Sequence, residues 1–222
     1  MSMRCLDLVL HHRLVAIIRL DNLSSAVQLS RALLAAGIVA QEFTLTNPRA
    51  LEAVARVLRE VPEFSAGGAT LGVGSVRTLA QARSAIQAGA QFVVSPIFQS
   101  EVVSGCVEQG VPVMCGAMTP TEIAAAWQAG ASLVKVFPAR SLGPKYISDV
   151  LAPMPELALM PTGGVGLDDM QNYFKAGAKA VGIGSNLFEM SALRLALWDR
   201  ISEVAAEFAS LAAQPDQPAM MS

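Results

Sequence analysis

A glycine preceded in most cases by alanine recurs along the chain, just before a short apolar run. Glycine at this position can take the left-handed conformation that stops a helix, and the strand then begins a few residues later. The pattern therefore predicts a series of junctions between a helix and the strand that follows it. These junctions lie at Ala36-Gly37, Ala88-Gly89, Gln109-Gly110, Ala129-Gly130 and Ala176-Gly177.

The junctions at 89, 110 and 130 are about twenty residues apart, the length of a compact strand–helix unit, and the wider gaps each have room for two units. Filling the gaps predicts eight strands, at Val15–Arg19, Val39–Leu45, Thr70–Ser75, Phe92–Pro96, Val113–Gly116, Leu133–Phe137, Leu159–Thr162 and Val181–Gly184. Helical patterns lie between them, over Leu23–Ala36, Pro48–Val61, Val76–Ala88, Glu101–Gln109, Pro120–Ala129, Leu167–Ala176 and Ala192–Leu211. Eight parallel units of this kind close into a TIM (β/α)8 barrel.

We therefore expect one α/β domain over residues 1–212 and a flexible C-terminal tail over residues 213–222, which carry two prolines and little periodicity. The run Thr119-Pro-Thr-Glu122 combines a hydroxyl cap, proline at the first helical position and glutamate at the third. This combination predicts a capping box at the start of the following helix.

The composition is rich in apolar residues, with 53% hydrophobic residues and a mean hydropathy of +0.45. No uncharged apolar run reaches the roughly 18 residues needed to span a bilayer, so the excess indicates buried parallel strands rather than a membrane protein. The net charge is −2 and no basic stripe occurs, which argues against nucleic acid as a partner.

The apolar segment Leu6–Leu20 is interrupted by charged residues and lacks a small-residue cleavage site, so we expect no export signal and a cytoplasmic location. The three cysteines, Cys5, Cys106 and Cys115, have no CxxC spacing. They are typical of small buried hydrophobes in a reducing compartment, and a structural zinc site is the alternative. The adjacent His11-His12 pair does not have metal-ligand spacing.

The stretch from Ala131 to Arg140 places Lys135 inside a run that otherwise has the pattern of a buried parallel strand. Burial favours the neutral amine, and a neutral amine is a nucleophile toward carbonyl groups. Because proline ends a strand's ladder, Pro138 places Lys135 near the C-terminal end of its strand, where α/β folds build their sites. The alternative is a snorkelling or ion-paired strand lysine. The remaining lysines have polar or small neighbours typical of a surface: Lys145, Lys175 and Lys179.

In a barrel, the C-terminal ends of the strands and the loops after them face one mouth. The candidate site residues there are Arg19 from strand one, Glu42 and Thr46 from strand two, Ser75 from strand three, Pro96 from strand four, Lys135 and Phe137 from strand six, Thr162, Gly163 and Gly164 from strand seven, and Gly184 and Ser185 from strand eight.

A carboxylate near a buried lysine either pairs with it or exchanges protons with a ligand, so Glu42 is a salt-bridge partner or an acid/base group. The glycines after strands seven and eight suit a phosphate site, because they let backbone N–H groups approach an anion, although glycines also serve tight turns. Arg19 falls at the mouth after four apolar residues, which favours an anion ligand over a solvent-facing residue. Thr162 would direct its hydroxyl toward the mouth.

Five motifs stand together at these strand ends: Glu42-Phe-Thr-Leu45, Gly72-Val-Gly-Ser75, Ser95-Pro96, Lys135-Val-Phe-Pro138 and Pro161-Thr-Gly-Gly164. In this combination the chain, from about Leu14 to Phe188, resembles the 2-keto-3-deoxy-6-phosphogluconate and 4-hydroxy-2-oxoglutarate aldolases. The resemblance implies a class I aldolase that needs neither cofactor nor metal, acts on a keto acid, pyruvate and an aldehyde, and assembles as a homotrimer.

The resemblance also implies the role of each residue. Lys135 would form the Schiff base and Glu42 would be the general acid/base. The other implied roles are packing on the pyruvyl group for Phe137, carboxylate binding for Ser75, phosphate binding for Gly163, Gly164 and Ser185, anion binding for Arg19, and stereochemical choice for Thr162.

The run Thr44-Leu-Thr-Asn47 departs from the family pattern, in which an arginine often follows the glutamate strand. Asn47-Pro48 is similar instead to galactonate-type and hydroxyoxoglutarate-type relatives, so the expected substrate is any of the three keto acids. Two alternatives stay open from the sequence. One is a phosphate-binding barrel isomerase or synthase without a covalent intermediate, and the other is a non-enzymatic ligand-binding barrel.

Overall fold

The computed structural model describes residues 2–214, in which eight parallel strands follow one another around a barrel. Neighbouring strands pair in chain order from β1 to β7, β8 pairs with β1, and a bridge between Thr162 and Gly182 connects β7 to β8. The strands are β1 (Leu14–Ile18), β2 (Ala40–Thr44), β3 (Thr70–Gly74), β4 (Phe92–Val94), β5 (Val113–Ala117), β6 (Leu133–Val136), β7 (Leu159–Pro161) and β8 (Val181–Ile183). The expected single-domain TIM barrel is confirmed.

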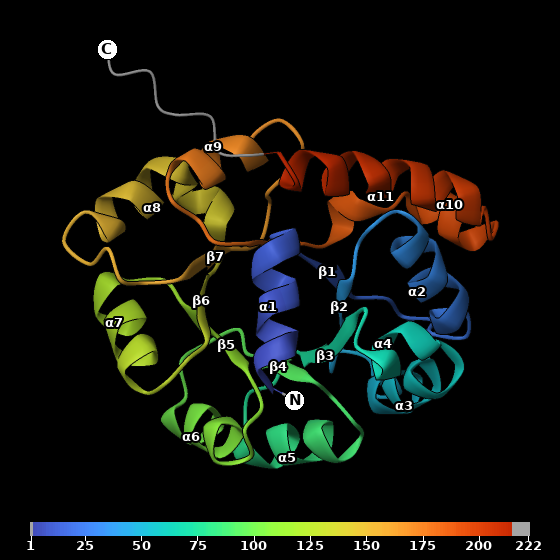
Figure 1. Ribbon diagram of the computed structural model, residues 1–222, viewed down its shortest axis with the longest axis horizontal. Helices are drawn as coiled ribbons and strands as arrows, with labels where there is room; N and C mark the ends of the chain where they lie inside the picture. The colour runs from blue at the N-terminus through green and yellow to red at the C-terminus, as the bar shows by residue number, and fades with distance from the viewer. Residues whose placement is uncertain (1, 215–222) are drawn as a thin grey trace.

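Helices surround the strands in a ring, and α1 lies across the centre of that ring in the view of Figure 1. The helices are α1 (Ser2–His12), α2 (Ala26–Ala35), α3 (Ala50–Glu60), α4 (Pro62–Ala66), α5 (Leu79–Gln87), α6 (Ser100–Glu108), α7 (Pro120–Gln128), α8 (Gly143–Leu151), α9 (Met170–Lys175), α10 (Met190–Arg194) and α11 (Trp198–Ala212). Two short 3-10 helices, η1 (Ala139–Ser141) and η2 (Ser185–Leu187), follow β6 and β8.

The helix-to-strand junctions predicted from the glycine pattern are confirmed. All five glycines have positive φ, between +64° at Gly110 and +100° at Gly130 and Gly177. The capping box before α7 is also present. Thr119 accepts a hydrogen bond from the Glu122 N–H, and the Glu122 carboxylate accepts one from the Thr119 N–H.

The prediction of a single helix over Ala192–Leu211 was wrong, because α10 and α11 are separated by Leu195–Leu197. Ala196 has φ +54°, a left-handed conformation that interrupts a helix. Three helices, α1, α4 and α8, were not among the predicted ones. The predicted tail falls mostly on residues 215–222, which lie outside the described residues.

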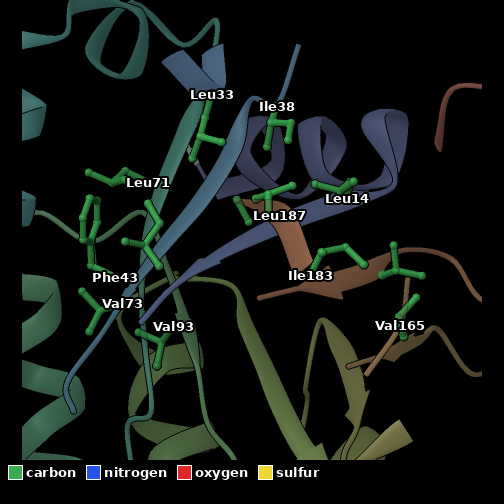
Figure 2. Close-up of a cluster of buried hydrophobic side chains, with 14 of the residues drawn as sticks. Leu14, Leu33, Ile38, Phe43, Leu71, Val73, Val93, Val165, Ile183 and Leu187 are labelled. Atoms are coloured by element: carbon green, nitrogen blue, oxygen red, sulfur yellow. The ribbon is translucent and has the colours of Figure 1, made fainter. Parts of the chain in front are cut away.

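Two groups of buried side chains form the core. The larger one fills the layer between the strands and the outer helices, as Figure 2 shows for Phe43, Leu71 and Ile183 from the strands and for Leu33 from α2. The smaller one brings inward-facing residues of several strands together with Cys5 and Val9 of α1. Helix α1 therefore closes one end of the barrel interior. No helix within residues 2–214 is both long and apolar enough to cross a membrane.

The two-residue alternation of a strand explains how the sequence places a lysine inside the barrel. Leu133 belongs to the inner apolar group, and Lys135, two residues later on the same face of β6, lies nearer the open mouth. Glycines face the interior at the same level. A Cβ added to Gly72 would meet the Phe92 ring, and one added to Gly182 would meet the Thr162 hydroxyl at 2.5 Å. Gly72 therefore leaves room for an apolar ring, and Gly182 leaves room for a polar side chain inside the barrel.

Candidate active site

Lys135 is 4% exposed and projects into the mouth half of the barrel from β6. Gly116 is its neighbour on β5 and Met160 its neighbour on β7. Burial lowers the pKa of Lys135, the Glu42 charge opposes that shift, and Arg19 adds to it. Its Nζ lies 5.2 Å from the centroid of the Phe137 ring. Burial in this position favours the neutral, nucleophilic amine.

Glu42 lies on β2, in register with Ile17 of β1 and Gly72 of β3, and is 1% exposed. Neither carboxylate oxygen accepts a hydrogen bond from any described residue. Burial raises the pKa of Glu42, although the Lys135 and Arg19 charges act in the opposite direction. Gly74 leaves room for this carboxylate, because a Cβ there would lie 2.3 Å from Glu42 Oε1. The carboxyl group is therefore suited to hold and release a proton at the barrel centre.

A cavity of about 420 Å³ opens at this mouth. Eight of the predicted site residues line it: Arg19, Lys135, Phe137, Thr162, Gly163, Gly164, Gly184 and Ser185. The cavity therefore joins the buried amine to the two glycine-rich loops. It is smaller than one other cavity, of about 530 Å³, which Cys5, Phe64 and Gly110 line at the α1 end of the barrel. We place the active site in the smaller one because it contains the lysine.

The other four predicted residues, Glu42, Thr46, Ser75 and Pro96, are not part of the cavity wall. The Thr46 hydroxyl lies 2.8 Å from that of Thr44, within hydrogen-bond distance. Ser75 follows β3 with φ +61°. The Pro96 backbone packs against Gly116, where an added Cβ would lie 2.2 Å from the Pro96 carbonyl carbon. These residues occupy the ends of β2, β3 and β4, beside the cavity.

The strand-seven loop, for which the sequence predicts an anion site, carries two glycines in the left-handed region. Gly163 and Gly164 have φ +91° and +92°. Both glycines line the cavity. Thr162 is buried and donates its hydroxyl hydrogen to the Met160 carbonyl at 3.3 Å. Ser185 begins η2 directly after Gly184.

Two further polar residues belong to this region and were not among the predicted site residues. Arg140 lines the cavity from η1. Asn47 donates hydrogen bonds from its amide to the carbonyl groups of Leu20 and Asp21, at 2.8 and 2.9 Å. Asn47 thereby fixes the loop that begins with Arg19. One feature of the sequence could have indicated that Arg140 lies near the site, because it follows Pro138 by two residues.

Within the described residues, no group of three or more His, Cys, Asp and Glu side chains could hold a metal ion. The three cysteines are unpaired and buried. Burial raises the pKa of Cys5 and of Cys106 to about 11, so these thiols stay protonated near neutral pH.

Residues 7–204 match the family model of the KDPG and KHG aldolases. The chain belongs to this family. It is 40% identical over 162 residues to a 2-dehydro-3-deoxy-phosphogluconate aldolase of Treponema pallidum, which covers 72% of this chain and 75% of the relative.

Solved structures agree with this aldolase assignment. A structure described as native KDPGal superposes with a TM-score of 0.81 at 30% identity, covering 89% of this chain and 93% of that one. The KDPG aldolase of Legionella pneumophila, captured with pyruvate as a covalent carbinolamine, gives a TM-score of 0.80 at 25% identity over 90% of this chain and 96% of that one. The resemblance stated from the motifs is confirmed, and the chain is a class I aldolase, a carbon–carbon lyase.

Proposed function

We propose that this aldolase cleaves a 2-keto-4-hydroxy acid to pyruvate and an aldehyde through a Schiff base on Lys135, with Glu42 as the general acid/base. The observation that carries the proposal is the placement of Lys135 and Glu42 inside the same barrel. A buried amine with a lowered pKa shares one barrel interior with a buried carboxyl group that has no hydrogen-bond partner among the described residues. The substrate is 2-keto-3-deoxy-6-phosphogluconate, its galactonate isomer or 4-hydroxy-2-oxoglutarate.

The reaction begins when the neutral amine of Lys135 attacks the C2 ketone, and loss of water from the carbinolamine gives an iminium ion. This cation accepts the electron pair of the C3–C4 bond. Glu42, acting through a water molecule, removes the proton of the C4 hydroxyl as that bond breaks. The products are an aldehyde, glyceraldehyde 3-phosphate or glyoxylate, and an enamine. Protonation of the enamine at C3 and hydrolysis release pyruvate and the free amine.

Other residues in and beside the cavity bind and orient the substrate in this proposal. Phe137 packs on the pyruvyl group beside the Lys135 amine, and Ser75 binds the carboxylate next to the ketone. Thr162 sets the stereochemistry at C4. The distal anionic group lies against Arg19, the Gly163-Gly164 pair and Ser185, all of which line the cavity.

The decisive test is borohydride reduction in the presence of pyruvate, followed by peptide mass spectrometry. We expect a reduced pyruvyl adduct on the peptide that contains Lys135, because borohydride converts the iminium to a stable secondary amine. Lys135→Met should abolish both the adduct and cleavage. Lys145→Met is the matched control, since Lys145 is exposed on α8 and pairs only with Asp149 in the described structure. A folded wild-type protein without an adduct on Lys135 would refute the proposed mechanism.

We also propose that the chain assembles as a homotrimer and works in the cytoplasm. Ile97 and Met118 support an assembly, because they are 45% and 39% exposed on the neighbouring loops after β4 and β5. Sedimentation equilibrium should give about three times the chain mass of 23.3 kDa. A single species at the chain mass would contradict the trimer. The unpaired cysteines are compatible with a reducing compartment.

A further inference from the structure

We propose that Arg140 is a specificity-determining residue that selects a phosphorylated substrate by binding its distal phosphate together with Arg19. This inference rests on the proposed function, because it names the substrate class of the same cavity. The motifs and the family assignment give Arg140 no role. The proposal rests on the position of Arg140 in the fold.

The backbone after β6 holds Arg140 against the strand-seven loop. Ala139 donates its N–H to the Thr162 carbonyl at 2.8 Å, and Arg140 donates its own to the Gly163 carbonyl at 2.9 Å. These bonds continue the pairing of β6 with β7 beyond the ends of both strands. Arg140 therefore has a fixed place beside the glycine loop, although its side chain is exposed to solvent.

Gly164 provides the space in which the Arg140 side chain lies. A Cβ on residue 164 would lie 2.6 Å from Arg140 Cβ and 2.9 Å from its Nε. Any larger residue there would push the arginine away from the loop. The side chain thus lies beside the Gly163-Gly164 pair, and all three residues line the cavity.

The charges of the cavity wall favour an anion with more than one negative charge. Three cationic side chains, Arg19, Lys135 and Arg140, line the cavity, and no acidic side chain does. No described residue accepts a hydrogen bond from the Arg140 guanidinium or forms an ion pair with it. Since Lys135 is neutral when it reacts, the two guanidinium groups supply the positive charge for the distal end.

The donor set is suited to a phosphate rather than to a carboxylate. Two guanidinium groups, of Arg19 and Arg140, line one cavity, and a phosphate presents three oxygens and up to two negative charges to them. In a six-carbon phosphorylated keto acid the phosphate is on C6, beyond the bond that breaks. The distal carboxylate of 4-hydroxy-2-oxoglutarate is C5 itself, so it ends nearer Lys135. Arg140, at the rim, is placed for the longer substrate.

The test compares the wild-type protein with Arg140→Gln, using 2-keto-3-deoxy-6-phosphogluconate, its galactonate isomer and 4-hydroxy-2-oxoglutarate as substrates. Loss of a charge-assisted hydrogen bond should raise KM for the better of the two phosphorylated substrates by roughly 10- to 100-fold. The kcat for that substrate and the KM for 4-hydroxy-2-oxoglutarate should each change by less than about threefold. Arg140→Lys should restore part of the loss, and Arg83→Gln, on the exposed face of α5, should behave as wild type.

Calorimetry with inorganic phosphate measures the same site without turnover, and Arg140→Gln should weaken phosphate binding by a similar factor. The inference is overturned if Arg140→Gln binds phosphate as the wild type does, if all three substrates are affected equally, or if neither phosphorylated acid is cleaved. Borohydride trapping of pyruvate keeps the two proposals apart. An adduct on Lys135 without phosphate selectivity would refute the role of Arg140 alone, whereas absence of the adduct would refute the Schiff-base mechanism.

Discussion

Burial shifts the pKa values of Lys135 and Glu42, the two residues on which the proposed mechanism depends, in opposite directions. Burial lowers the pKa of the lysine and raises the pKa of the glutamate, so both neutral forms are favoured. Each charge opposes the shift of the other. The amine must be neutral to attack a ketone, and the carboxyl group must exchange a proton near neutral pH. Burial thus favours the reactive form of the amine directly, whereas the Lys135 and Arg19 charges favour the carboxylate that the proposed base step needs.

Replacing Glu42 by glutamine should move the pKa of Lys135 further down. The Glu42 charge raises this pKa, whereas burial and the Arg19 charge lower it and both remain in the variant. The pH midpoint of Lys135 labelling by acetic anhydride, followed by mass spectrometry, should therefore fall. Cleavage should slow by roughly 100-fold or more, because the proton acceptor is lost.

Lys145 gives an internal control for this experiment, because it lies on the surface of α8 and its labelling midpoint should not change. Pyruvate should still be trapped on Lys135 in the variant. A midpoint that rises, or stays in place, would show that the carboxylate charge does not act on the lysine.

Single residues also show what the sequence could reveal about the site. Lys135 was identified because a charged residue interrupts an apolar strand, which is visible in the sequence itself. Arg140 was not identified, because its proposed role depends on contacts with Gly164 and the Gly163 carbonyl, more than twenty residues away in the chain. Contacts between loops of different strands leave no periodic signal.

At the scale of elements, the strands were predicted within one or two residues, since five of them are apolar runs that follow a glycine junction and the other three fill the gaps before and between the repeats. The interruption between α10 and α11 was missed, because Ala196 is left-handed although alanine ordinarily favours helix. The tertiary structure overrides the local preference there. The missed helix α1 precedes the first junction, so the repeat that located the other elements gave no signal for it.

Hydrogen bonds of Asn47 connect two loops at the mouth of the barrel. Asn47 belongs to the run Thr44-Leu-Thr-Asn47, which departs from the family pattern. The Asn47 amide holds the carbonyl groups of Leu20 and Asp21, and its oxygen accepts a hydrogen bond from the Arg49 N–H. The loop that carries Arg19 is therefore tied to the loop after β2.

The whole molecule divides its tasks between the two ends of the barrel. At one end α1 packs its apolar side chains into the interior, and at the other glycines and polar residues surround Lys135. In TIM barrels the C-terminal ends of the strands carry the chemistry, while the opposite face serves stability. This separation predicts that changes in α1 will affect stability and leave catalysis intact.

Val9→Ala tests that separation. Val9 is fully buried in the inner apolar group, so removing two methyl groups should lower the free energy of unfolding by about 1.5–3 kcal/mol, measured by urea denaturation at fixed protein concentration. Leu10→Ala is the matched control on the same helix, because Leu10 is 38% exposed and should change stability by less than about 0.5 kcal/mol. Both folded variants should keep the wild-type kcat and the Lys135 adduct. A loss of kcat in folded Val9→Ala would mean that the closed end of the barrel is coupled to the mouth, since Val9 and Lys135 lie in different halves of the interior.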